Sequence, residues 1–283
     1  MSSAFDRLRI FLSRTSGLSL DAEKAYFAES RLQPLMQREK LADIDALVAR
    51  IGSDPYSDFA REVVNAMTTN ETFFFRDRTP FDNFRNIVLP ALLEARKDVR
   101  RIRIWCAACS TGQEPYSLAM ILDEEAHKLT GWQIGILATD LSSSVVADAR
   151  EGFYSQFEVQ RGLPISLLLR YFAQSGDRWR INEHLRSRIR FEEFNLLSDY
   201  GELGHFDVIF CRNVLIYFDV PTKQAVLAKM ARALAPDGYF FMGAAETVVG
   251  LTEAFTPHAE HRSINVPREH LASARAPLRL VAG

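Results

Sequence analysis

The chain has 283 residues, of which 47% are hydrophobic and 25% charged, and its formal net charge is -2. This composition excludes a disordered chain, and the length allows one large domain with a smaller one. The small net charge predicts no general affinity for polyanions, and no apolar run approaches the roughly 20 residues that span a bilayer.

The first quarter of the chain shows only helical patterns. Residues 1–14 are charged and lack an apolar signal-peptide core, so we expect a cytoplasmic protein. Asp21 is expected to cap a helix that runs to Lys40, and two shorter helices are expected at 44–51 and 56–67. These helices predict a separate domain over residues 1–75.

From residue 76 onward, strands alternate with helices. Pro80 is expected to open a helix that leads into a strand at 102–105. Further strands are expected at 132–138, 206–211 and 239–242, and further helices at 142–150 and 221–234. The alternation predicts an α/β fold with a doubly wound Rossmann-like sheet, and residues 76–283 are assigned to this domain.

The alternation is interrupted in the middle of this domain. A helix is expected at 165–172, and short strands are expected at 178–181 and 188–194. These strands predict a small antiparallel sheet inserted at about 172–194. Beyond it, periodicity fades near the end of the chain, and a flexible tail is expected at about 267–283.

Cys106, Cys109 and Cys211 are an odd number of cysteines without a disulfide framework. Cys106 and Cys109 form a C-x-x-C pair, which elsewhere can bind zinc or form a redox disulfide. Here only Cys211 remains as a further sulfur ligand, and no two histidines stand at ligand spacing. We interpret both residues of the pair as small buried hydrophobic residues and expect no metal.

The segment 105–117, WCAACSTGQEPYS, joins an apolar strand to an apolar-striped helix through small residues. In a doubly wound sheet, such a turn lies at the carboxyl edge, where small residues let a ligand approach the backbone. Gly112 is the only glycine in the turn, so the dinucleotide fingerprint G-x-G-x-x-G is absent. A nicotinamide cofactor is therefore disfavoured, and a smaller nucleoside-type ligand is left open.

Three polar residues follow predicted strands and are candidates for ligand contacts. Asp140 follows the second strand, where an acidic side chain can bind a ribose diol, although it could instead cap the next helix. Asn195 and Asn213 follow later strands, where their amides could bind a base or an amino-acid group or serve only as turn residues. A further polar segment with three phenylalanines, 68–77, could be an interdomain linker or a lid over the ligand.

Six segments resemble the CheR family of chemotaxis receptor methyltransferases. They are NETFFFR (70–76), STGQEPYS (110–117), ATD (138–140), NLL (195–197), FDVIFCRNVLIYF (206–218) and PDGYF (236–240). The resemblance covers nearly the whole chain and has the family's order. It implies an enzyme that uses S-adenosylmethionine to methylate glutamate side chains of a protein.

The resemblance also implies which residues form the site. The cofactor pocket would be lined by Asn70, Thr72, Arg76, Glu114, Asp140, Asn195, Leu196, Asn213 and Val214, with Asp140 on the ribose hydroxyls. Arg76 and Tyr217 would lie near the transferred methyl group as the catalytic residues. Gln113 departs from the family, which usually has a second acid there, and Glu246 lacks the serine that usually precedes it. Neither departure falls on a residue that the resemblance assigns to the site, so we expect the chain to be an active methyltransferase.

The chemistry explains why the sequence offers no general base. A glutamate, with a pKa of about 4.3, is already ionised at neutral pH and can attack a methyl sulfonium directly. The enzyme must align the two groups and remove water, and alignment can lower a barrier by about 7–11 kcal/mol. Arg76 is expected to orient the carboxylate, and Tyr217 to shape its approach.

The implied partner is the cytoplasmic helical domain of a chemoreceptor, which is acidic at its methylation sites. Arg31, Arg38 and Lys40 provide a basic face on the first domain, or simply a solvated one. Some family members also bind a receptor tail peptide as an added strand on the small sheet. The turn at 174–177 lacks the longer glycine-rich loop of those members, so no tethering is expected.

Two other functions remain open. A nucleic-acid methyltransferase would explain the arginines within 180–190, but the near-neutral charge and the lack of a base-reading motif disfavour this partner. A non-catalytic module could bind the cofactor or its product as a signal, although Arg76 and Tyr217 argue for turnover. We expect a monomer that does not insert into membranes.

Overall fold

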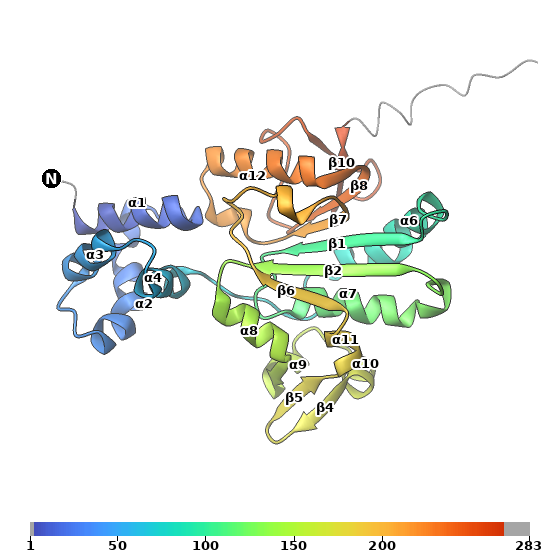
Figure 1. Cartoon of the computed structure of the whole chain (residues 1–283), viewed down its shortest axis with the longest axis horizontal. Helices are drawn as coiled ribbons and strands as arrows, with labels where there is room; N and C mark the ends of the chain where they lie inside the picture. Colours follow the sequence, from blue (N-terminus) through green and yellow to red (C-terminus); the bar gives the residue numbers. More distant parts are fainter. Residues whose placement is uncertain (1–2, 269–283) are drawn as a thin grey trace, which may run out of the picture.

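The computed structural model describes residues 3–268 of the chain. It contains a helical domain, a larger α/β domain and a small three-stranded sheet (Figure 1), which confirms the predicted fold class. From residue 269 onward, the tail predicted at 267–283 lies outside the described range. No helix between residues 3 and 268 has both the length and the hydropathy that crossing a membrane requires.

The helical domain packs its helices around one apolar core. They are α1 (Ala4–Ser16), α2 (Ala25–Arg38), α3 (Ile44–Ser53) and α4 (Asp58–Met67). Each helix contributes at least one fully buried residue to this core, among them Leu12, Leu32, Leu47 and Val63. Because helices of this length are marginal alone in water, packing of their apolar stripes stabilises the domain.

Helix α1 was missed by the sequence prediction, although its ends carry recognisable signals. Ser3 and Asp6 form a capping box, and Gly17 ends the helix in the left-handed conformation with φ 77°. The prediction that Asp21 caps the next helix was wrong. Its side chain makes no capping hydrogen bond, because the chain enters α2 through a short 3₁₀ turn (Ala22–Lys24).

An interrupted helix leads from the linker to the sheet. It begins as α5 (Thr79–Asn83), with Pro80 in its first turn, widens into a π-helical turn (Phe84–Val88) and ends as α6 (Leu89–Ala95). The wider turn precedes Pro90, which has no N–H to donate to the carbonyl four residues earlier.

The α/β domain is built on a seven-stranded sheet with the order β6-β2-β1-β7-β8-β10-β9. The strands are β1 (Arg101–Ala107), β2 (Gln133–Asp140), β6 (Ile189–Glu193), β7 (Phe206–Cys211), β8 (Leu234–Met242), β9 (Phe255–Pro257) and β10 (Ile264–Pro267). The first five in spatial order are parallel, and β10 and β9 are antiparallel. The other helices are α7 (Gln113–Glu124), α8 (Ser143–Glu151), α9 (Gln156–Gln160), α10 (Ile165–Tyr171), α11 (Glu183–Arg186) and α12 (Val220–Ala233).

Both faces of the sheet are buried, as a doubly wound fold requires. In β1, Ile104 and Cys106 belong to the core on one face, whereas Trp105 and Ala107 belong to the core on the other. Helix α7 covers the first face and α12 the second (Figure 1). The helices cover the faces of the sheet and not its carboxyl edge, so the carboxyl ends of β1 and β2 face the helical domain (Figure 1).

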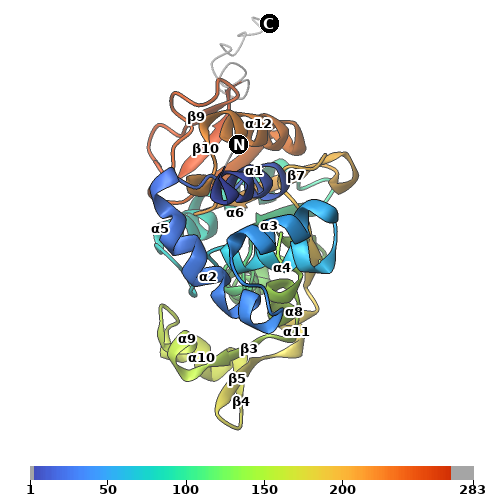
Figure 2. The same cartoon turned by 90° about the vertical axis from the view of Figure 1, so that its left-hand side faces the viewer.

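The small sheet differs from its prediction. It has the order β3-β5-β4, with β3 (Phe153–Ser155), β5 (Arg178–Ile181) and β4 (Phe172–Ser175), and it projects away from the main sheet (Figures 1 and 2). The strand expected at 188–194 was wrongly assigned to it. That segment forms β6, which pairs in parallel with β2, because its buried Ile189 and Phe191 pack into the main core.

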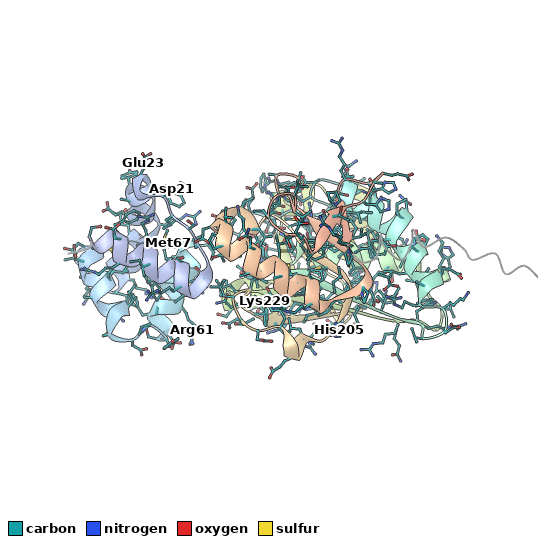
Figure 3. The ribbon with its side chains drawn as sticks, turned by 90° about the horizontal axis from the view of Figure 1, so that it is seen from above. Asp21, Glu23, Arg61, Met67, His205 and Lys229 are labelled. Atoms are coloured by element: carbon teal, nitrogen blue, oxygen red, sulfur yellow. The ribbon has the colours of Figure 1, made fainter. Side chains whose placement is uncertain are left out.

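The two domains meet at the carboxyl edge of the sheet. Leu18 and Phe218 form an isolated β-bridge, and Ser19 N–H donates to the Tyr217 carbonyl at 2.8 Å. Figure 3 shows the domains side by side from above, with Met67 on the helical domain and the α/β domain beyond it. The segment that follows α1 thus contacts the loop after β7 directly.

Candidate active site

A cavity lies between the helical domain and the carboxyl edge of the sheet. Its empty space, including solvent at the open mouth, is about 970 Å³. All ten predicted site residues line it: Asn70, Thr72, Arg76, Glu114, Asp140, Asn195, Leu196, Asn213, Val214 and Tyr217. The fold therefore brings together residues from five separate segments.

The backbone of the cavity wall is strained. Ala108, Ser110 and Asn213 line the cavity with φ values of 62°, 50° and 59°, in a region that costs non-glycine residues of order 1–3 kcal/mol. In the same turn, Gly112 has φ 93°, and a Cβ there would lie 3.0 Å from the Cβ of Ala149. Such conformations persist where surrounding packing enforces them, and they cluster at binding sites.

Asp140 ends β2 with a buried carboxylate. Its Oδ2 accepts from Ser110 N–H at 2.8 Å, and its Oδ1 accepts from Ser142 N–H at 3.1 Å. Ser142 is the N-cap residue of α8, so Asp140 supports the helix start without being its cap. Burial raises the pKa of Asp140, against the opposing effect of the backbone donors. Because a carboxylate has about four acceptor positions, two remain for a ligand.

A buried ion-pair cluster surrounds Arg212, which also lines the cavity. Its side chain is 2% exposed, and its guanidinium donates to Glu114 at 2.9 Å, to Asp77 at 2.7 Å and to the Arg76 carbonyl at 2.8 Å. Within the described residues its buried Nε–H has no acceptor. Burial raises the pKa of Glu114, and the attraction of Arg212 opposes that rise.

The segment 68–77, predicted to be an interdomain linker or a lid, lines the cavity through residues 68–72 and Arg76. Phe74 is fully buried, whereas Phe73 and Phe75 are half-buried. Arg76 stacks near the Phe73 ring, and its side chain donates to the Glu71 carbonyl at 2.7 Å. Among residues 3–268 this is the only hydrogen bond of the Arg76 guanidinium, so its other N–H groups remain available to a ligand.

The loop after β6 is hydrogen-bonded to α1 on one side and to α12 on the other. Asn195 Nδ2 donates to the Thr15 carbonyl of α1 at 2.6 Å, which makes Asn195 a bridge between the domains. The Leu196 carbonyl accepts from Lys229 Nζ at 2.7 Å and from the Tyr200 hydroxyl at 2.8 Å. Lys229, labelled in Figure 3, lies on α12 outside the cavity and supports its wall from behind.

Tyr217 lies where the two domains meet. Its ring packs against the core of the helical domain and against one core of the α/β domain. Its hydroxyl has no hydrogen-bond partner in the part of the chain that the structure describes. The structure places Tyr217 half-buried at the cavity.

The basic face predicted on the first domain is partly engaged within it. Arg31 donates to the carbonyls of Met67 and Thr68 and to the Thr69 hydroxyl, so it ties α2 to the linker at the cavity. Arg38 is exposed and pairs with two glutamates. Lys40 is exposed and forms no ion pair within the described range.

The three cysteines are buried, as expected of small hydrophobic residues, and burial raises the pKa of each thiol. Between residues 3 and 268 no group of three or more His, Cys, Asp or Glu side chains is placed to hold a metal ion.

Family models match both domains. Residues 3–68 match the CheR methyltransferase all-alpha domain, and residues 70–264 match the CheR methyltransferase SAM binding domain. The chain belongs to the CheR methyltransferase family. It is thus an S-adenosylmethionine-dependent methyltransferase, and the resemblance inferred from its sequence is confirmed.

Relatives in this CheR family match over most of their length. The chain is 42% identical to the chemotaxis protein methyltransferase Cher2 of Pseudomonas putida over 255 residues, which cover 89% of this chain and 92% of that protein. Identity to the chemotaxis protein methyltransferase 1 of Pseudomonas aeruginosa is 43% with the same coverage. Identity to the chemotaxis protein methyltransferase 1 of Vibrio cholerae is 40%, over 87% of this chain and 89% of that protein.

Sequence reasoning missed several residues of this CheR site. Arg212 stands directly before Asn213 in the segment that carried the resemblance, so its position gave a usable signal. Ser110 contacts Asp140 through its backbone, which no side-chain motif reveals. Lys229 acts from a helix remote in sequence, and nothing around it in the sequence points to the site.

Proposed function

We propose that this CheR enzyme transfers the methyl group of S-adenosylmethionine to glutamate side chains on the cytoplasmic helices of chemoreceptors, giving glutamyl methyl esters. The observation that carries the proposal is the convergence of all ten predicted residues on one interdomain cavity. The relatives are named chemotaxis protein methyltransferases, which supports a chemoreceptor as the protein substrate.

The charges around the cavity suit this cofactor. Asp140 keeps acceptor positions for the two ribose hydroxyls. The buried Nε–H of Arg212 needs an acceptor, which a ligand carboxylate would provide, and Glu114 would attract an ammonium group. The proposed contact set is completed by Asn70, Thr72, Arg76, Asn195, Leu196, Asn213 and Val214.

The mechanism follows from the free donors of Arg76 and Tyr217. When bound, S-adenosylmethionine supplies an electrophilic methyl group on a positively charged sulfur. Arg76 has unused N–H groups that can orient the incoming glutamate without protonating it, because that carboxylate is ionised at neutral pH. The Tyr217 hydroxyl can donate to the same carboxylate, while its ring limits the approach and excludes water.

Receptor recognition is assigned to the helical domain. Lys40 and the exposed side of Arg38 are available to acidic receptor helices, whereas Arg31 is used inside the protein. We propose no tethering to a receptor tail, because β4 and β5 are joined only through Gly176 and Asp177. Appreciable binding of a receptor tail peptide, measured by calorimetry, would refute this part.

The test is transfer of labelled methyl groups to membranes that carry chemoreceptors. Wild type should produce label that alkali releases, as expected of a methyl ester, and Asp140→Ala should lose the transfer. Asp98→Ala is the matched control, because Asp98 is exposed and lies just before β1, at the opposite edge of the sheet. Cofactor binding without any transfer would instead support a signal-binding module or another acceptor.

A further inference from the structure

Glu246 lies outside the cavity, but its carboxylate collects backbone donors from two loops that meet there. Its Oε2 accepts from Asn213 N–H at 2.7 Å and from Gly243 N–H at 2.8 Å. Its Oε1 accepts from Val214 N–H at 3.1 Å and from Ile216 N–H at 3.3 Å. The side chain is half-buried. One anion thus binds four N–H groups, three of them on the loop after β7.

These bonds stabilise a left-handed backbone conformation in the loop. Asn213 is left-handed with φ 59°, and hydrogen bonds to an ionised acceptor are about twice as strong as neutral ones. On its other side the same loop is held by the helical domain, through Ser19 and the Tyr217 carbonyl. The loop that carries two proposed cofactor contacts and Tyr217 is therefore clamped between both domains.

We infer that Glu246 is a positioning residue for methyl transfer: it sets the backbone of the loop after β7 so that Asn213 and Val214 reach the cofactor and Tyr217 reaches the acceptor. The inference rests on the proposed roles of these three residues. Glu246 itself does not line the cavity, so it acts only through the loop.

The main test is Glu246→Gln, which keeps the shape but replaces one acceptor oxygen with an NH₂ group that faces backbone donors. The dissociation constant for S-adenosylmethionine, measured by calorimetry, should rise about tenfold. In the methylation assay, KM for S-adenosylmethionine should rise and kcat should fall, because the same loop carries Tyr217.

Glu125→Gln is the matched control for this variant. The Glu125 side chain is 14% exposed and pairs with Lys128 and Arg85 at the far end of α7. It undergoes the same chemical change away from the cavity and should lower the melting temperature without weakening cofactor binding. This comparison separates positioning from general stability.

Gly243→Ala perturbs the same contact independently, and it keeps the inference testable if Glu246→Gln does not fold. A Cβ at Gly243 would lie 2.6 Å from Asn213 Nδ2 and 2.7 Å from Glu246 Oε2. Affinity for S-adenosylmethionine should fall here too, and the double variant should be no weaker than the worse single one. Gly52→Ala, which meets no atom within 4 Å, is the control.

The inference is overturned if Glu246→Gln or Gly243→Ala binds S-adenosylmethionine within twofold of wild type. It is also overturned if Glu125→Gln weakens binding equally, or if the two site variants are additive. A failure of the proposed function would give a different result. Wild type would then bind the cofactor but methylate no receptor, while the differences in cofactor affinity between the variants would persist.

Discussion

Arg212 is the residue whose loss should most damage the cavity wall, and Arg212→Met tests this. The substitution keeps much of the apolar stem but removes the cation that hydrogen-bonds to Glu114, whose side chain is 11% exposed. A buried carboxylate without its partner costs about 3–5 kcal/mol of stability. Asp77 also loses a bond, but its side chain is 35% exposed and can be solvated instead.

The loss should depend on pH in a defined direction. Burial already raises the pKa of Glu114, and removing Arg212 should raise it further. The folded variant then binds a proton more tightly than the unfolded chain does. Its free energy of unfolding should therefore increase as the pH falls from about 8 toward about 5, and the deficit relative to wild type should shrink.

Urea unfolding followed by circular dichroism at about pH 8 and about pH 5.5 measures both effects. Arg212→Met combined with Glu114→Gln should recover part of the loss at the higher pH and flatten the pH dependence, because no buried charge is left unpaired. Arg38→Met, on an exposed arginine, should change stability little. The reasoning fails if Arg212→Met stays within about 1 kcal/mol of wild type, or if the double variant is no more stable than the single one.

Three further outcomes follow from the site. Lys229→Met removes a charged donor from the Leu196 carbonyl, and the affinity for S-adenosylmethionine, measured by calorimetry, should fall about tenfold. An unchanged affinity would show that Lys229 does not help to position Leu196 in the cavity wall. Affinity should also fall as the pH is lowered toward the raised pKa of Asp140, since protonation removes an acceptor, and Asp140→Asn should bind weakly with a flatter profile; a wild-type affinity independent of pH argues against this contact. Gly112→Ala forces a Cβ against Ala149 at φ 93° and should cost about 1–3 kcal/mol in urea unfolding; full stability would mean that the turn relaxes freely.

Local patterns were sufficient for most elements and for three of the candidate site residues, Asp140, Asn195 and Asn213, whereas the other seven came from the resemblance to the CheR family. Apolar residues concentrated in β1 and β7 predicted buried strands, and Pro80 marked the start of α5, because these signals depend on neighbours along the chain. The same locality made Asp140 and Asn213 recognisable as residues that follow strands. Parallel strands end at one edge, so positions after strand ends predict residues that meet in space.

Pairing between distant segments was decided only by the tertiary structure. The apolar pattern of β6 fits either sheet, and its place beside β2 follows from burial against the main core. Arg212 pairs with Glu114 across 98 residues and with Asp77 across 135. No local pattern encodes such a partner, because the guanidinium is desolvated and becomes dependent on these carboxylates only when the fold closes around it.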